Sequence, residues 1–95
     1  MAAYVIADNA VTDIDAYKEY ARQAAPTIAK FGGRVIARDA NAVVLDGDWD
    51  PQRVVVIEFD TAEQAKAWYE SADYKGPKSI KKSASRVRTI LVAGI

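Results

Sequence analysis

The sequence predicts an α+β fold in which helices cover one face of an antiparallel β-sheet. The apolar run Arg53–Phe59 is typical of a buried strand, and Thr61–Gln64, which follows it, has the pattern of a capping box that begins a helix. The third observation is the order of segments, because strand-like and helix-like patterns follow one another as β-α-β-β-α-β along the 95 residues. These three observations predict the architecture.

The first half of the chain is expected to form a strand and a long helix. Residues 3–7 are an apolar run, and Thr12 is the expected N-cap of the helix, since two carboxylates follow it in the first turn. We expect Pro26 to kink or split this helix near Gln23, and Gly32–Gly33 to end it. The apolar face, with spacings of three and four, consists of Ile14, Tyr17, Ala21, Ala24, Ile28 and Phe31.

The second half completes the sheet. Residues 41–46 are expected to extend the second strand past a turn or bulge. Further elements are expected as strands at 34–38, 53–59 and 88–93, a helix at 61–71 and a shorter helical stretch at 77–84. This order is the split βαβ pattern of a ferredoxin-like fold, whose right-handed crossovers place the helices on one face of a four-stranded sheet.

Composition limits the possible functions. With 51% apolar and 27% charged residues, the chain is expected to be one globular domain over residues 1–95. It has no cysteine or histidine, which excludes a Cys or His nucleophile, a zinc cage and a haem-binding His, so we expect no metal or cofactor. A net charge of zero disfavours nucleic acid and anionic membranes as partners. The start does not resemble a signal peptide and no apolar run could span a bilayer, so the cytoplasm is the expected location.

The two faces of the predicted sheet differ, because alternate residues of a strand point to opposite sides. One set is wholly apolar and is expected beneath the helices: Ala3, Val5, Ala7, Val35, Ala37, Val55, Ile57, Phe59, Leu91 and Ala93. The other set mixes an apolar centre with charged ends: Tyr4, Ile6, Asp8, Arg34, Ile36, Arg38, Val54, Val56, Glu58, Arg88, Ile90 and Val92. An uncovered apolar centre usually marks an interface, so we expect a homodimer with the two sheets facing each other.

The charged ends of this second face are the candidate site. The candidate ligand-binding residues are Tyr4, Asp8, Arg34, Glu58 and Arg88, which would line a small cavity between the two sheets. In a cofactor-free isomerase or oxygenase, one carboxylate would act as general base and an arginine would stabilise the developing anion. The simpler alternative is a set of ion pairs that fix the dimer geometry without catalysis. We expect the cavity to bind a small organic molecule.

Other patterns have simpler structural explanations. The tyrosines at 4, 17, 20 and 69 and Trp68 suit an aromatic ligand but are more simply core residues, whereas Trp49 and Tyr74 are expected to gate the cavity or seal the interface.

Asp46, Asp48 and Asp50 lack the glycine and glutamate of a calcium loop. The central strand lacks the aromatic side chains on which RNA-recognition modules stack bases. A basic stretch is expected to be a solvated helix face: Lys75, Lys78, Lys81, Lys82, Arg86 and Arg88.

Taken together, several fragments resemble a bacterial family catalogued as domain of unknown function 1330, within the dimeric α/β-barrel superfamily. They are Ala3–Ile6, Asp13 with Tyr17 and Tyr20, Phe31–Arg34, Gly47 with Trp49, Arg53–Phe59 and Trp68–Ser71 followed by Tyr74. The resemblance implies a ferredoxin-like subunit and a face-to-face homodimer, and no settled activity. Relatives in the wider superfamily include cofactor-free monooxygenases, lactone isomerases and haem proteins. The chain departs from the family at Lys81, where an arginine is expected, and at Ala93, where an acidic residue often occurs.

Overall fold

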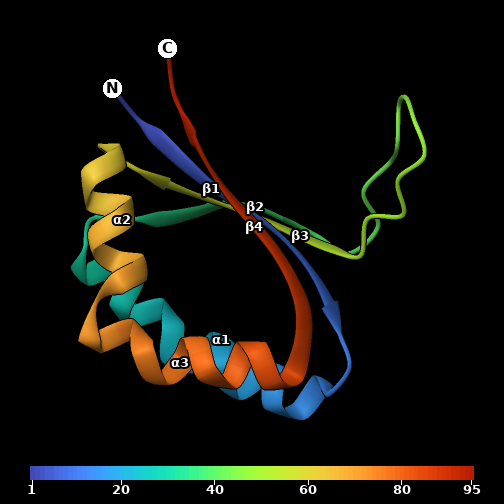
Figure 1. The fold of residues 1–95 in the computed structure, drawn as a ribbon, viewed down its shortest axis with the longest axis horizontal. Helices are drawn as coiled ribbons and strands as arrows, with labels where there is room; N and C mark the ends of the chain where they lie inside the picture. The colour runs from blue at the N-terminus through green and yellow to red at the C-terminus, as the bar shows by residue number, and fades with distance from the viewer.

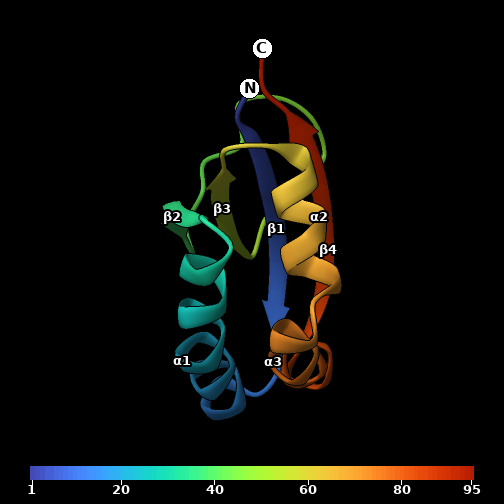
Figure 2. The same ribbon diagram turned by 90° about the vertical axis from the view of Figure 1, so that its left-hand side faces the viewer.

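The computed structural model describes residues 1–95 as four strands and three helices. The antiparallel sheet has the order β2-β3-β1-β4, and all the helices lie on one side of it (Figure 1, Figure 2). This arrangement confirms the ferredoxin-like α+β fold. The elements are β1 (Ala3–Val11), α1 (Ile14–Lys30), β2 (Arg34–Asp39), β3 (Arg53–Phe59), α2 (Ala62–Glu70), α3 (Ala72–Ala84) and β4 (Ser85–Ala93).

Helix α1 begins one residue later than expected. Thr12 is not its cap, because both the amide and the hydroxyl of Thr12 donate to the carbonyl of Ala84, at 2.8 and 3.1 Å. Asp13 is the N-cap instead, and its carboxylate accepts a hydrogen bond from the amide of Ala16 at 3.1 Å. The start of α1 is therefore tied to the end of α3.

Helix α1 continues through Pro26 without a break, so the expected split is wrong. The proline ring lies on the exposed side of the helix, where loss of one amide donor is least costly. The helix ends in a Schellman motif, in which the amide of Gly33 donates to the carbonyl of Ile28 at 2.9 Å and that of Gly32 to Ala29 at 3.0 Å. Gly32 has a φ of 78°, the left-handed conformation that this motif requires.

Helices α2 and α3 share one capping residue. Thr61 caps α2 as predicted, since its hydroxyl accepts from the amide of Gln64 at 3.1 Å. Ser71 ends α2 and also begins α3, because its hydroxyl accepts from the amide of Tyr74 at 3.1 Å and donates to the carbonyl of Trp68 at 2.7 Å. This second cap starts α3 at Ala72, ahead of the expected Pro77, which lies inside the helix.

The strand register confirms the division into two faces, with one exception. Val5 of β1 pairs with Ile57 of β3 and Leu91 of β4, and all three lie on the helix-covered face. In β2, however, a bulge between Val35 and Ala37 shifts the register by one residue. Ala37 therefore lies on the open face and Arg38 on the helix-covered face, the reverse of the expectation, because a single inserted residue reverses the alternation.

The loop between β2 and β3 contains no strand, so the expected extension of β2 over 41–46 is wrong. The chain turns away at Asp39, whose carboxylate accepts from the amide of Asn41 at 2.7 Å. Residues 40–52 then project from the sheet on the side away from the helices (Figure 1). We call this segment the 40–52 loop.

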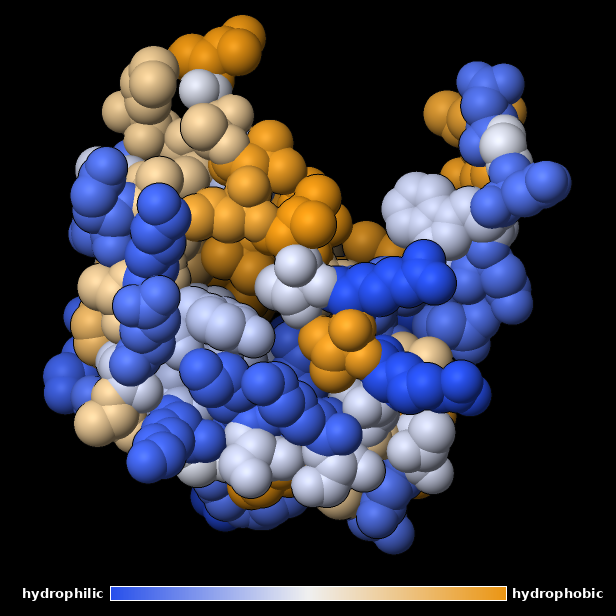
Figure 3. Space-filling model, in the orientation of Figure 1, coloured by the Kyte–Doolittle hydropathy of each residue, from blue (hydrophilic) through white to orange (hydrophobic).

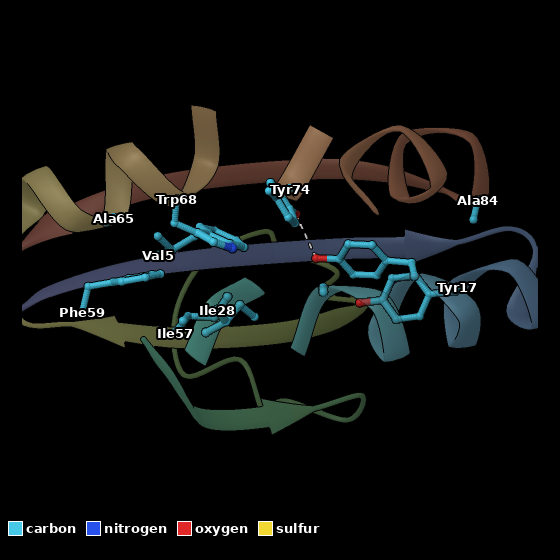
Figure 4. Packing of buried hydrophobic residues seen from close by; sticks show 11 residues of the cluster. Val5, Tyr17, Ile28, Ile57, Phe59, Ala65, Trp68, Tyr74 and Ala84 are labelled. Carbon is cyan, nitrogen blue, oxygen red and sulfur yellow. Dashed lines mark hydrogen bonds between the residues drawn. The ribbon is translucent and has the colours of Figure 1, made fainter. Parts of the chain in front are cut away.

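The core lies between the three helices and the sheet and is rich in aromatic rings (Figure 4). Trp68, Tyr74 and Phe59 are fully buried, and the rings of Trp68 and Tyr74 lie 4.1 Å apart. The hydroxyls of Tyr20 and Tyr74 share a hydrogen bond of 2.9 Å. Tyr74 is therefore a core residue and not the gate or interface seal that the sequence suggested. Ile14, which was expected on the apolar face of α1, is instead exposed at the N-terminal end of this helix.

None of the three helices combines the length and the apolar character that a bilayer span requires. The His, Cys, Asp and Glu side chains form no group of three that could hold a metal ion.

Candidate functional site

The residues proposed from the sequence lie on the open face in two separate groups. At one end, Tyr4 pairs with Glu58, and Glu58 pairs with Arg34 across the strands. Arg34 donates from Nε to Oε1 of Glu58 at 2.9 Å and from Nη2 to Oδ1 of Asp60 at 3.2 Å. Both hydrogen bonds raise the pKa of the Arg34 guanidinium, and the bond to Asp60 has the larger effect. This group has the geometry of the ion-pair alternative.

At the other end, Asp8 and Arg88 are register partners on β1 and β4. The carboxylate of Asp8 accepts from the indole Nε1 of Trp49 at 3.1 Å and from the amide of Gln52 at 2.9 Å. Asp8 thus fixes the base of the 40–52 loop. Four residues separate Tyr4 from Asp8 along β1, a distance of roughly 13 Å in a strand. Within one subunit, the two groups do not converge on one ligand.

A polar groove lies between the 40–52 loop and the edge of the sheet. It has a volume of about 400 Å³, and only three of its nine lining residues are hydrophobic. Asp8, Trp49 and Arg88 all line it. Figure 3 shows the loop standing away from the main body, with apolar side chains gathered on the body across the gap. The groove itself is therefore mainly polar, and an apolar surface lies beside it.

A second and mainly apolar cavity lies on the opposite side of the sheet, between α1 and the strands. We call it the helix-side cavity. Its volume is about 240 Å³, and 14 of its 20 lining residues are hydrophobic. Helix α1 lies closer to α3 than to the sheet, and the small side chains of Ala7 and Ala24 leave space between the helix and the strands. Val35 and Arg38, at the β2 edge, line the cavity and are exposed, so this edge is the entrance.

The polar residues of the helix-side cavity include no acid. They are Asn9, Lys18, Arg38, Arg53, Lys81 and Thr89. The guanidinium of Arg53 lies 5.4 Å from the centre of the Tyr17 ring, and the bulge in β2 brings Arg38 to this face. Four cationic side chains without a carboxylate give the cavity a positive potential, which favours an anionic ligand.

Lys81 is the most unusual residue of the cavity. It is only 6% exposed, its Nζ lies 5.6 Å from the centre of the Tyr20 ring, and it forms no ion pair. Burial lowers the pKa of its ammonium group to about 8. The expectation that the basic stretch is a solvated helix face holds for Lys75 and Lys82 and is wrong for Lys81, since Lys81 points from α3 into the molecule.

Two neutral polar groups in the same cavity also lack partners. Asn9 is 2% exposed, and its Nδ2 donates to the hydroxyl of Tyr17 at 2.8 Å while its Oδ1 has no hydrogen-bond partner. The buried hydroxyl of Thr89 has none either. Buried polar atoms are nearly always satisfied, so unpaired ones in a cavity point to a bound molecule or water. The sequence carried a signal for Asn9, because it is the only polar residue among the alternate positions of β1 that are buried.

The tyrosine hydroxyls of the cavity region are hydrogen-bonding groups and not bases. Burial raises the pKa of Tyr20 to about 12 and raises the pKa of Tyr74 further. Both phenols therefore stay protonated at neutral pH. Tyr20, Trp68 and Tyr69 line the cavity as well as packing in the core, so the ligand-stacking and packing interpretations apply to the same side chains.

Solved structures with the same fold include proteins of known and unknown function. A protein of unknown function from Rhodopseudomonas palustris has a TM-score of 0.82 and 16% identity, covering 99% of this chain and 82% of that one. A dimeric ferredoxin-like protein of unknown function from Jannaschia sp. CCS1 has a TM-score of 0.79 and 8% identity, covering 99% and 100%. SnoaB, a cofactor-independent oxygenase from Streptomyces nogalater, has a TM-score of 0.72 and 9% identity, covering 99% and 93%.

The TM-scores show a shared fold, and sequence identities this low show nothing beyond the fold. No curated protein matches the chain in sequence. A family model does match, over residues 2–95, and it describes a domain of unknown function, DUF1330. The match spans nearly the whole chain and agrees with the fragments that the sequence analysis identified. The chain therefore belongs to the DUF1330 family.

Proposed function

We propose that the protein binds a small organic anion in the helix-side cavity. The observation that carries this proposal is a mainly apolar lining that holds the mostly buried Lys81 together with two buried polar atoms, of Asn9 and Thr89, that have no hydrogen-bond partner. An apolar ligand body would fill the space beside α1, and its anionic group would pair with the cations. This placement differs from the cavity between sheets that the sequence suggested.

The volume limits the size of the ligand. A dry cavity of ~150 Å³ in another protein holds benzene, so about 240 Å³ admits roughly one ring with one or two substituents. The side chains of Tyr17, Tyr20 and Trp68 supply aromatic surfaces for such a ring. Small aromatic carboxylates are therefore the first compounds to test.

The experiment is a thermal-shift screen with benzoate and its hydroxylated derivatives, followed by NMR mapping of any compound that stabilises the protein. We expect amide shifts at Asn9, Ala24 and Thr89. The variant Ala24→Leu, which fills the cavity, should weaken binding by on the order of tenfold or more, about 1.4 kcal/mol. The matched control Ala67→Leu, at an exposed position of α2, should leave affinity unchanged. Shifts confined to the open face would instead support the cavity between sheets.

The open face supports a homodimer. Ile36, Ile90 and Val92 on this face are 52%, 59% and 39% exposed, and contiguous apolar surface of this kind usually marks an interface. The 40–52 loop projects on the same side and carries the exposed side chains Val43 and Leu45 (Figure 1). A second copy facing this surface would bury both and would complete the polar groove.

The dimer is tested by light scattering at micromolar concentration. The wild-type chain should have twice the monomer mass, and Ile90→Glu should shift it to the monomer because it places a charge in the exposed apolar part of the open face. The control Ala67→Glu adds the same charge on α2 and should stay dimeric. A wild-type monomer would refute the dimer while leaving the helix-side cavity available for ligand.

A cofactor-free reaction is the second candidate function. The neutral amine of Lys81 would act as a base toward an activated carbon, with the Asn9 amide and Tyr17 hydroxyl nearby as polar groups. SnoaB, which shares the fold, is a cofactor-independent oxygenase. Exchange of a ligand's acidic C–H in deuterated water, lost in Lys81→Met, would favour catalysis. Binding without exchange would favour a binding or dimerisation module.

A further inference from the structure

We propose that Lys81 captures small carbonyl compounds as an imine, so that the helix-side cavity selects aldehydes and 2-oxo acids. This inference rests on the proposed ligand cavity and adds the chemical class of its ligand.

The geometry distinguishes Lys81 from the other lysines of the chain. Lys30 pairs with Asp73 at 2.7 Å, and the ammonium of Lys78 donates to the carbonyl of Tyr69 at 2.9 Å and lies 4.3 Å from its ring centre. Lys81 has neither an anionic partner nor a carbonyl acceptor, and it lies on the wall of a cavity of about 240 Å³. Its amine is therefore free to meet a molecule that enters.

The environment also favours the reactive form of the amine. Burial among apolar side chains disfavours the ammonium ion. With a pKa of about 8, on the order of 10% of Lys81 is unprotonated at pH 7, compared with roughly 0.03% of a solvated lysine. Desolvated lysines of this kind are the ones that form Schiff bases in proteins.

The reaction needs no external oxidant or reductant. The amine lone pair attacks the carbonyl carbon to form a C–N bond, and a proton moves from nitrogen to the former carbonyl oxygen to give a carbinolamine. Loss of that oxygen as water forms the C=N bond. Amine and carbonyl thus become imine and water. The unpartnered hydroxyl of Thr89 lines the same cavity and is a hydrogen-bond donor for the carbonyl oxygen.

The charges of the cavity narrow the ligand class further. Arg38 and Arg53 remain as cations when Lys81 becomes an imine, so a carboxylate on the ligand would still have a partner. An apolar or aromatic aldehyde with a carboxylate, or an aromatic 2-oxo acid, has the apolar body, the reactive carbonyl and the anionic group that this cavity would select.

The test treats the folded wild-type protein with 4-carboxybenzaldehyde and sodium cyanoborohydride. The cyanoborohydride reduces any imine to a stable secondary amine. Intact mass spectrometry counts the adducts and peptide mapping locates them. Among the lysines we expect one adduct, at Lys81, formed on the order of tenfold or more faster than at any other lysine, and peptide mapping separates it from an adduct on the exposed α-amino group of Met1. The variant Lys82→Arg, at an exposed position next in the chain, should be labelled as the wild type is. Lys81→Arg keeps the charge and should lose the rapid labelling.

The wild-type map decides the result even if Lys81→Arg folds poorly. Labelling spread over exposed lysines, or equal in folded and urea-unfolded protein, would overturn the proposal. Benzoate, which has no carbonyl carbon able to form an imine, separates the two inferences. If benzoate binds the cavity and Lys81 is not selectively labelled, the ligand cavity stands and the imine is wrong. If benzoate slows labelling of Lys81 alone, both are supported.

Discussion

Replacing Lys81 by methionine should stabilise the protein at neutral pH, since methionine fills a similar volume without a buried charge. The folded-state pKa of Lys81 is about 8, against an ordinary value of 10.5. Between these values the unfolded chain binds more protons than the folded one, so the contribution of Lys81 to stability rises with pH. Its position in the last turn of α3 favours the cation by only about 0.3–1 kcal/mol, which is smaller than the effect of burial.

The magnitude follows from the two pKa values. Lys81 costs roughly 3 kcal/mol at pH 7 and roughly 1 kcal/mol at pH 9.5. The stabilisation by Lys81→Met should therefore fall by about 2 kcal/mol over this range. Measurements stop at pH 9.5 because the raised pKa of Tyr20, about 12, has the opposite effect at higher pH. The other charged side chains that line the same cavity are Lys18, Arg38 and Arg53.

The assay is urea unfolding of both proteins at pH 7 and 9.5, at one fixed protein concentration. Lys82→Met provides the control, because Lys82 is exposed and its substitution should give the same small change at both pH values. A difference between wild type and Lys81→Met that does not depend on pH would refute the inference that Lys81 is buried and desolvated.

Two further changes test the packing. Removing the hydroxyl in Tyr74→Phe should lower the free energy of unfolding by about 1–2 kcal/mol, because it leaves the buried hydroxyl of Tyr20 unpaired. The double variant that also carries Tyr20→Phe should be little less stable than Tyr74→Phe alone. Fully additive losses in urea unfolding would contradict this coupling. Gly33→Ala should cost about 1–3 kcal/mol, since its Cβ would lie 2.5 Å from a ring atom of Phe59. Gly76→Ala in α3 meets no atom within 4 Å apart from its chain neighbours and should change stability by less than about 1 kcal/mol, because the gain in helix propensity is opposed by its position before Pro77. Equal effects of the two alanines would argue against this close approach.

Hydrophobic periodicity was sufficient to predict the elements and the two sheet faces. The alternation in β1 and β3 and the capping box at Thr61 depend on residues close in sequence, and the structure confirms both. Helix boundaries were less accurate where a distant residue decides them. Thr12 donates a hydrogen bond to the carbonyl of Ala84 and so does not cap α1, which starts one residue later than expected. No local pattern reveals a contact between residues so far apart in the sequence.

The helix-side cavity could not be predicted because it depends on the space between layers. The small side chains of Ala7 and Ala24 are consistent with either close packing or a void, and only the position of α1 decides between them. The basic stretch gave no sign that Lys81 differs from Lys82, since the two are adjacent and chemically identical. The cytoplasmic location, the absence of nucleic acid as a partner and the ligand-binding role of Tyr4 and Glu58 stay predictions.

The bulge in β2 also bears on how far assembly proceeds. Strand β2 is at one margin of the sheet, and all of its residues are exposed, so its free amides and carbonyls would pair readily with a strand from another molecule. An irregular margin is a poor template for such strand addition. In a pair of copies that meet face to face, the bulge at Ile36 would therefore disfavour edge-to-edge addition of further strands at β2.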